Sequence, residues 1–204
     1  MKQFEVVRGC DASELHLGQA IEIDRVVYPQ ELQGVPDNCL KWFNKNPNIY
    51  TFLLDKEENK VIGYSNAMPI TETLYDKIID GIILDSHIDE EDILTYEENK
   101  NYILYFCSLL VHPDYQNTKA FSLLYDEYIT QAIELASRNI YIDKVIVEGA
   151  TKKGARICRL SGLEPIATSK SNNPLYGLYV PNKHFNPLSS VAEKLQELYK
   201  KSTE

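Results

Sequence analysis

The sequence has no long apolar run and no excess of positive charge. Its 204 residues include 21 Lys and Arg against 30 Asp and Glu, which gives a formal net charge of -9. Nucleic-acid binding needs clustered cations that neutralise phosphates, so no DNA or RNA partner is expected. No segment approaches the ~18 consecutive apolar residues of a membrane-spanning helix, so no membrane association is expected. The first residues, MKQFEVVRGC, contain no apolar secretory segment, which predicts a cytoplasmic location.

Metal-binding patterns are also missing. The four cysteines are widely separated, with no C-x-x-C pair and no nearby histidine pair: Cys10, Cys39, Cys107 and Cys158. Zinc sites need closely spaced ligands, so we expect no metal. Scattered cysteines in a chain of this length are typical of reduced, mostly buried thiols in a cytosolic protein.

What the sequence does contain is typical of one globular domain. Hydrophobic residues make up 44% and charged residues 25%, and 204 residues can bury a substantial core. Strand-like and helix-like segments occur without a repeat or linker, which predicts a single α/β domain over residues 1–204. An amphipathic helix is expected at about 189–202. It could pack on the core, which we favour, or on a second subunit, which would give a homodimer.

An acidic insertion is expected at about 85–99. This segment has no Lys or Arg, and its acidic residues are Asp85, Asp89, Glu90, Glu91, Asp92, Glu97 and Glu98. Such a charge run is typical of a solvated insertion. Alternatively, it attracts a cationic substrate toward an active-site mouth.

The most informative stretch runs from Tyr102 to Leu135. Its first part, up to Val111, is almost unbroken apolar sequence and predicts a strand that is buried on both faces. Pro113 cannot donate to a sheet and should end the strand, and Thr118 is a candidate N-cap for the helix that follows. A strand that leads into a helix N-terminus gathers free N–H groups that suit a phosphate. The same pattern also describes an ordinary strand–helix pair.

Two segments in register resemble the GNAT superfamily of N-acetyltransferases. SLLVHPDYQNTKAFSLL (Ser108 to Leu124) is similar to the family's cofactor segment, and EGATKKGARICRLSGLEP (Glu148 to Pro165) is similar to its next strand and helix. The resemblance implies a mixed, largely antiparallel, splayed sheet flanked by helices. It also implies an N-acetyltransferase that moves an acetyl group from acetyl-CoA to a primary amine of a small molecule or peptide, by direct attack in a ternary complex.

The resemblance further implies which residues bind the acetyl-CoA. The pantetheine arm would pair like an added strand with the end of the central strand, at Leu109, Leu110 and Val111. The pyrophosphate would lie at the start of the next helix, over the loop Gln116, Asn117, Thr118, Lys119, Ala120 and Phe121. Lys119 and Phe121 stand where the family has glycines, and the Lys119 ammonium could bind phosphate in their place. Thr151 stands where the family often has a cofactor-contacting asparagine.

Acetyl transfer needs a base for the amine proton and an acid for the leaving thiolate. Cys158 lies where many family members have a tyrosine, so its thiol is either the acid or an inert buried group. Tyr105 and Glu148 are the first candidates for the base, because they lie on strands that should line the splayed cleft. Glu22 and Glu31, near the first helix, are further candidates.

Two other interpretations stay open at this point. The chain could be a non-catalytic binding or regulatory module of the same fold, with weakened or lost CoA binding. It could also be an unrelated α/β domain that matches the two segments by chance.

Overall fold

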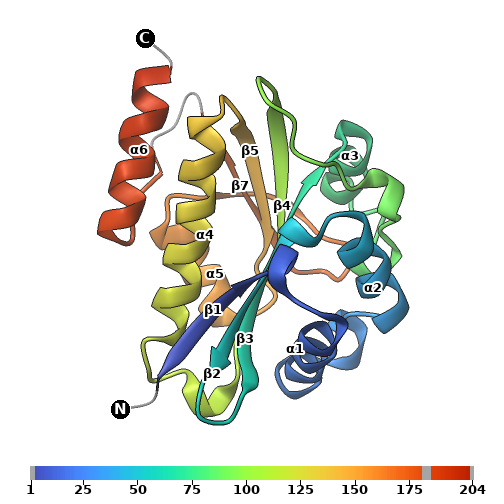
Figure 1. Ribbon diagram of the computed structural model, residues 1–204. Coiled ribbons are helices and arrows are strands. Elements are labelled where there is room, and N and C mark those ends of the chain that lie inside the picture. Colours follow the sequence, from blue (N-terminus) through green and yellow to red (C-terminus); the bar gives the residue numbers. More distant parts are fainter. Residues whose placement is uncertain (1–2, 181–184, 203–204) are drawn as a thin grey trace. The chain divides into compact units, whose positions relative to one another are not determined.

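The computed structural model describes residues 3–180 and 185–202 (Figure 1). The strands are β1 (Phe4–Arg8), β2 (Tyr50–Asp55), β3 (Lys60–Ile70), β4 (Asn101–Val111), β5 (Tyr141–Glu148), β6 (Glu164–Thr168) and β7 (Pro174–Tyr179). The α-helices are α1 (Glu14–Val27), α2 (Pro36–Lys45), α3 (Glu72–Ile79), α4 (Ala120–Ser137), α5 (Lys152–Leu160) and α6 (Ser190–Ser202). Of the loop expected between β7 and α6, residues 181–184 lie outside the described residues.

The strands form one seven-stranded sheet in the order β1-β2-β3-β4-β5-β7-β6. Strands β4 and β5 are parallel, whereas β1 with β2, β2 with β3, β5 with β7, and β6 with β7 are antiparallel. The chain is therefore an α/β domain with a mixed, largely antiparallel sheet, as the sequence predicted.

The chain divides into two compact units. The first consists of Met1–Ala67, Asp85–Ile93 and Cys107–Tyr128, and the second of Met68–Leu84, Leu94–Phe106 and Ile129–Glu204. Strands β3 and β4 and helix α4 each contribute residues to both units.

Local signals explain where the helices begin and end. Ser13 is the N-cap of α1, where its side chain and that of His16 form a capping box. The helix stops at Val27 because the following residue precedes a proline. Thr151 starts α5 by accepting the Gly154 N–H at 3.0 Å.

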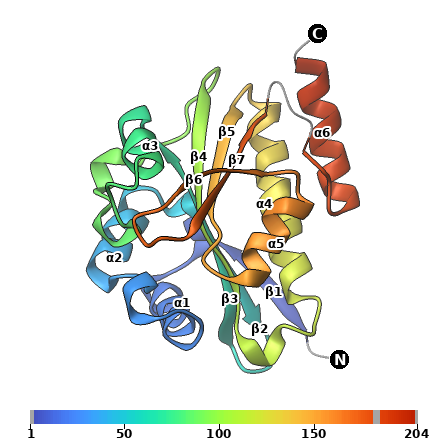
Figure 2. The same cartoon turned by 180° about the vertical axis from the view of Figure 1, so that it is seen from behind.

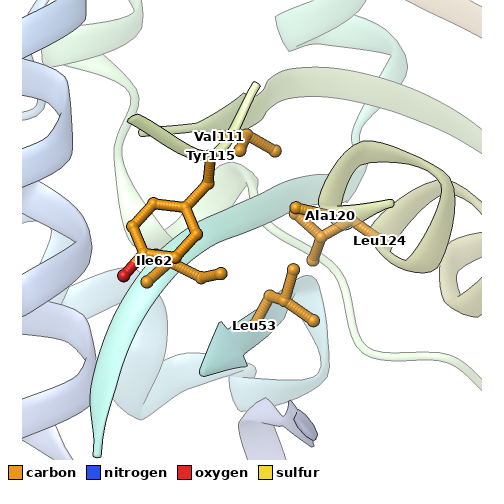
Figure 3. Packing of buried hydrophobic residues seen from close by; sticks show 6 residues of the cluster. All are labelled: Leu53, Ile62, Val111, Tyr115, Ala120 and Leu124. Carbon is orange, nitrogen blue, oxygen red and sulfur yellow. The ribbon is translucent and has the colours of Figure 1, made fainter. Parts of the chain in front are cut away.

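The hairpin of β2 and β3 forms the centre of the first unit. All of β2 is buried, and so is β3 after its first residue. On one face, the side chains of Leu53, Ile62, Val111, Tyr115, Ala120 and Leu124 converge in a hydrophobic cluster (Figure 3). Gly63 allows β4 to lie close to β3, because a Cβ at this position would meet the Leu110 carbonyl oxygen at 2.7 Å. The start of α4 is thus packed onto the hairpin.

The acidic insertion is anchored to the first unit by its apolar residues. Ile88 and Ile93 are buried, at 2% and 1% exposure. The Trp42 indole N–H donates to the Ile88 carbonyl at 3.0 Å, and the Asn38 amide donates to the Ser86 carbonyl at 2.5 Å. The acidic side chains themselves are exposed or half-buried. Residues 85–93 are therefore a packed segment with an acidic outer surface.

The second unit is built on β5, which lies between β4 and β7. Helix α5 packs on β7 through Ala155, Cys158 and Tyr176, and both elements can be followed in Figure 2. Helix α6 packs on β5 through Tyr199, whose hydroxyl accepts the Ile142 N–H at 2.8 Å. The C-terminal helix therefore packs on its own core, which was the favoured alternative.

Candidate functional site

Strand β4 extends past the end of its pairing with β5. The parallel register runs from Asn101 opposite Tyr141 to Phe106 opposite Val147, and β4 then continues to Val111. Burial changes at the same point, because residues 102–105 are buried and 106–109 are half-buried. The prediction of burial on both faces was therefore wrong for residues 106–109. Residues 107–109 follow the last β5 pair, and this part of the strand is half-buried.

The turn after β4 is held by polar contacts with the hairpin. The Tyr115 hydroxyl donates to the buried Asp55 carboxylate at 3.0 Å. The His112 N–H donates to the Ile62 carbonyl at 2.8 Å, and the His112 ring accepts the Asp114 N–H at 3.3 Å. His112 is thus a turn residue, and Tyr115 fixes the direction in which the chain enters the next loop.

Residues 116–119 form an exposed loop that leads into α4. The Thr118 hydroxyl donates to the Tyr115 carbonyl at 2.7 Å and accepts the Ala120 N–H at 3.2 Å. The Leu123 N–H donates to the Lys119 carbonyl at 3.0 Å, which begins the helical pattern. Thr118 therefore lies one residue before the N-cap position, yet its side chain satisfies one of the free N–H groups at the helix start.

Phe121, the second of the two residues that stand where the resembled family has glycines, packs against the hydrophobic core. The Phe121 ring packs against the cluster of Figure 3 and stacks on Tyr125, with ring centroids 6.3 Å apart and planes 15° from parallel. Earlier in the loop, the Gln116 amide donates to the Val111 carbonyl at 3.3 Å. Asn117 and Lys119 are exposed. Phe121 thus serves the core, while Asn117 and Lys119 face solvent.

The residues expected to act in catalysis lie in the second unit. Tyr105 is 1% exposed. The Glu148 carboxylate accepts the Asn173 amide N–H at 2.7 Å. Cys158 is buried, and burial raises the pKa of its thiol to about 11. These three residues belong to one unit and the expected loop 116–121 to the other.

A buried polar side chain that was not predicted from the sequence lies on the inner face of α1. Asp24 is 5% exposed, and its carboxylate accepts the Tyr64 hydroxyl at 2.5 Å and the Gly34 N–H at 3.1 Å. Burial raises the pKa of Asp24, although both hydrogen bonds oppose this. Glu22, the nearby candidate base, is exposed and pairs with Arg25. The missed signal was spacing, because Asp24 follows the buried Leu17 by seven residues and shares its helical face.

Replacing Asp24 with asparagine should stabilise the protein increasingly as pH rises. The pKa of Asp24 is raised above its unfolded value of 3.8, so the stability contributed by its neutral form is complete below about pH 4 and is lost as pH rises through the folded pKa. Without a charge, asparagine can accept the Gly34 N–H on its carbonyl oxygen and donate from its amide to the Tyr64 hydroxyl oxygen. Urea unfolding at about pH 4.5 and at about pH 8 measures the difference between variant and wild type.

The exposed Glu58 in the β2–β3 turn provides a matched control. Glu58→Gln also removes one carboxylate, but it should change stability little at either pH. A stability difference for Asp24→Asn that stayed constant or fell between the two pH values would contradict the prediction.

Within residues 3–180 and 185–202, no helix is long and apolar enough to cross a membrane. The same residues contain no group of three or more His, Cys, Asp or Glu side chains that could hold a metal ion.

Comparisons with known proteins find similarity in structure only. No family model and no curated protein matches the sequence. The loading GNATL domain of CurA from Lyngbya majuscula has a TM-score of 0.61 at 10% identity, covering 89% of this chain and 100% of that one. A mosquito arylalkylamine N-acetyltransferase like 5b has a TM-score of 0.56 at 12% identity, covering 87% and 100%. The NatC complex bound to Gag peptide and CoA has a TM-score of 0.57 at 11% identity, covering 92% of this chain and 99% of that one. At sequence identities this low, the similarity shows a common fold and nothing more.

Proposed function

Since this chain has the GNAT N-acetyltransferase fold, we propose that it moves an acetyl group from acetyl-CoA to a primary amine of a small molecule or peptide. The observation that carries the proposal is the end of β4, where residues 107–111 continue past the last β5 pair and residues 107–109 are half-buried. This segment leads directly through the exposed loop 116–119 to the start of α4.

The residues at this end of β4 suit a CoA thioester. Peptide groups of Leu109 to Val111 would pair with the amides of the pantetheine arm. The first N–H groups of α4 have no acceptor within the helix, which favours a pyrophosphate there. The exposed Lys119 would add a positive charge. Phe121 would obstruct a bound pyrophosphate less than its position suggests, because its ring packs against the hydrophobic cluster.

Bound acetyl-CoA would supply an activated acyl group. A backbone N–H of residues 109–111 would polarise the acyl carbonyl, and no covalent enzyme intermediate is needed. Cys158, whose pKa is raised to about 11, stays protonated at neutral pH and is our candidate for the acid. Glu148 and Tyr105 are retained as candidates for the base. The acidic outer surface of residues 85–93 favours a cationic acceptor.

Calorimetry with acetyl-CoA and with CoA, followed by thiol release with a panel of amines, tests this function. Saturable binding together with amine-dependent thiol release supports an enzyme. Binding without thiol release favours the second candidate, a non-catalytic module, which the substituted glycine positions at Lys119 and Phe121 support. Absence of binding at high acetyl-CoA concentration would rule out the transferase.

Replacing Lys119 with alanine should weaken acetyl-CoA binding by about 1 kcal/mol, which is roughly fivefold. The loss should shrink at high salt because the charge on this exposed side chain is screened. The exposed Lys60 at the start of β3 supplies a control, and Lys60→Ala should leave the affinity unchanged. Calorimetry at low and high salt measures both variants. An unchanged affinity for Lys119→Ala would refute its phosphate role.

A further inference from the structure

One carboxylate of the acidic segment 85–93 reaches the end of β4. The Cys107 thiol donates to the Asp85 carboxylate, with 3.4 Å between Sγ and Oδ2. Cys107 is the first residue of β4 beyond Phe106, the last one that pairs with β5. Asp85 and Cys107 both belong to the first unit, and both are half-buried. The contact therefore joins the acidic segment to the part of β4 on which the proposed function depends.

This contact lies close along the strand to the peptide groups proposed to polarise the acyl carbonyl. Consecutive strand residues are about 3.3 Å apart, so Cys107 and Leu109 are separated by roughly 7 Å along β4. An amine can bridge such a distance, because its nitrogen lies about 3 Å from a carboxylate that holds it and about 3–3.5 Å from a carbon that it attacks. The position of Asp85 therefore suits a group that holds the acceptor.

The backbone around Asp85 is held in place by helix α2. The Ser86 carbonyl accepts the Asn38 amide at 2.5 Å. The Ile88 carbonyl accepts the Trp42 indole N–H at 3.0 Å. The Ile88 N–H in turn donates to the Asp85 carbonyl at 3.0 Å, which closes the short turn at the start of the segment. A carboxylate on a backbone that is already fixed loses little conformational entropy when it binds a ligand.

The neighbouring acids differ from Asp85 in their surroundings. Asp89 accepts the Glu91 N–H at 3.3 Å, and both side chains are exposed. Glu90 lies 4.0 Å from the Lys41 ammonium. An ion pair at an exposed site is screened by water and contributes little, whereas a half-buried carboxylate attracts a cation more strongly. Asp85 is therefore better placed than Asp89 or Glu91 to bind a cation.

The Cys107 thiol is a weak partner for this carboxylate. Burial is the main cause of the raised pKa of Cys107, and the charge of Asp85 raises this pKa further, so the sulfur keeps its proton. A thiol donates only a weak hydrogen bond, whereas a primary ammonium has three charged N–H donors. An ammonium group is therefore a stronger partner for the Asp85 carboxylate than the thiol is.

We propose that Asp85 binds the ammonium group of the acceptor amine beside the end of β4. The inference rests on the proposed transferase function and deepens it by naming the acceptor class, which is primary amines that are protonated at neutral pH. The exposed acids of the segment would raise the local concentration of such amines, and Asp85 would supply the contact that selects them. Removal of the ammonium proton is a separate step, for which Glu148 and Tyr105 stay the candidates.

Calorimetry with benzylamine and benzyl alcohol tests the assignment, because the two molecules share a skeleton and only the amine is protonated at neutral pH. Wild type should bind benzylamine about 10-fold to 100-fold more tightly, as expected for a hydrogen bond between charged groups. Asp85→Asn should lose this preference, since asparagine keeps an acceptor for the Cys107 thiol but carries no charge. Glu91→Gln removes the same charge from an exposed position of the segment and should keep the preference.

Steady-state thiol release supplies a second readout. For the most active amine of the panel, Asp85→Asn should raise KM for the amine by a similar factor and leave the calorimetric affinity for acetyl-CoA unchanged. A merely structural role of Asp85 would instead weaken the binding of both substrates. Glu91→Gln should keep the wild-type KM.

The outcomes separate this inference from the transferase function. If Asp85→Asn keeps the preference for benzylamine, or if wild type has none, the assignment is wrong whether or not thiol is released. If the preference depends on Asp85 but wild type releases no thiol with any amine, Asp85 binds amines and the transferase function fails. If Asp85→Asn does not fold, Asp85→Glu decides, because its carboxylate is displaced by one methylene group and should bind benzylamine more weakly. An Asp85→Glu protein with the wild-type preference would then overturn the assignment.

Discussion

Replacing Trp42 with alanine should lower the free energy of unfolding by about 3–5 kcal/mol. The indole is 3% exposed, so alanine leaves a large cavity between α2 and its surroundings. The change also removes the donor to the Ile88 carbonyl and so frees the anchor of residues 85–93. Urea unfolding followed by circular dichroism measures the loss, since the only tryptophan, and with it the fluorescence signal, is gone.

Trp42→Phe separates the two parts of this effect. Phenylalanine fills most of the volume but cannot donate to Ile88, so it should cost less than alanine. Its own cost should be roughly the 1–3 kcal/mol penalty that a buried unsatisfied carbonyl carries. Faster cleavage of residues 85–93 by a glutamate-specific protease should accompany either change. An alanine variant as stable as wild type would show that the indole is not a central core residue.

Gly9→Ala should destabilise the protein by about 3 kcal/mol or more. A Cβ at Gly9 would lie 1.8 Å from the Pro47 carbonyl oxygen and 3.0 Å from that of Tyr50. Both are backbone atoms, so relief requires a shift of the segment that carries β2, and no side-chain rotation suffices. The free energy of unfolding from urea titration is the measurement.

Gly18→Ala is the matched control, because a Cβ at Gly18 in α1 meets nothing within 4 Å. Alanine there should stabilise the protein by about 0.5–1 kcal/mol, as in other exposed helix interiors. Equal effects of the two substitutions would contradict the close approach of Gly9 to Pro47.

Much of the fold could be predicted where one local signal was strong. Strand β5, from Tyr141 to Glu148, is one example, because an apolar segment is followed there directly by Gly149. The hairpin of β2 and β3 follows from two apolar runs around a polar turn, and the end of α1 from Tyr28 and Pro29. In each case the deciding interaction lies within a few residues of the chain.

Features that depend on distant segments could not be predicted in this way. The half-burial of β4 at residues 107–109 comes after β5 has stopped pairing with it, and the β4 sequence does not encode where that pairing ends. The anchoring of Ile88 depends on Trp42, 46 residues earlier. Acidic composition correctly suggested a polar surface there, but it concealed the two buried isoleucines.

The candidate site likewise has a part that could be predicted from the sequence and a part that could not. The resemblance identified Ser108 to Leu124 as one segment, and in the structure this segment runs from the end of β4 through the exposed loop 116–119 into α4. Whether these residues bind acetyl-CoA stays a prediction. Asp24 was missed because its partners, Tyr64 and Gly34, are 40 and 10 residues away.

The contact between Tyr199 and Ile142 makes one amide proton a reporter for the C-terminal helix. The Ile142 N–H is bonded to a side-chain hydroxyl of α6, and the first paired residues of β5 and β7 are Lys144 and Tyr179. Exchange of this proton with deuterated solvent therefore depends on α6 staying in place, whereas the amides farther along β5 are held by the sheet. The ratio of these exchange rates measures how often the helix detaches while the rest of the sheet stays folded.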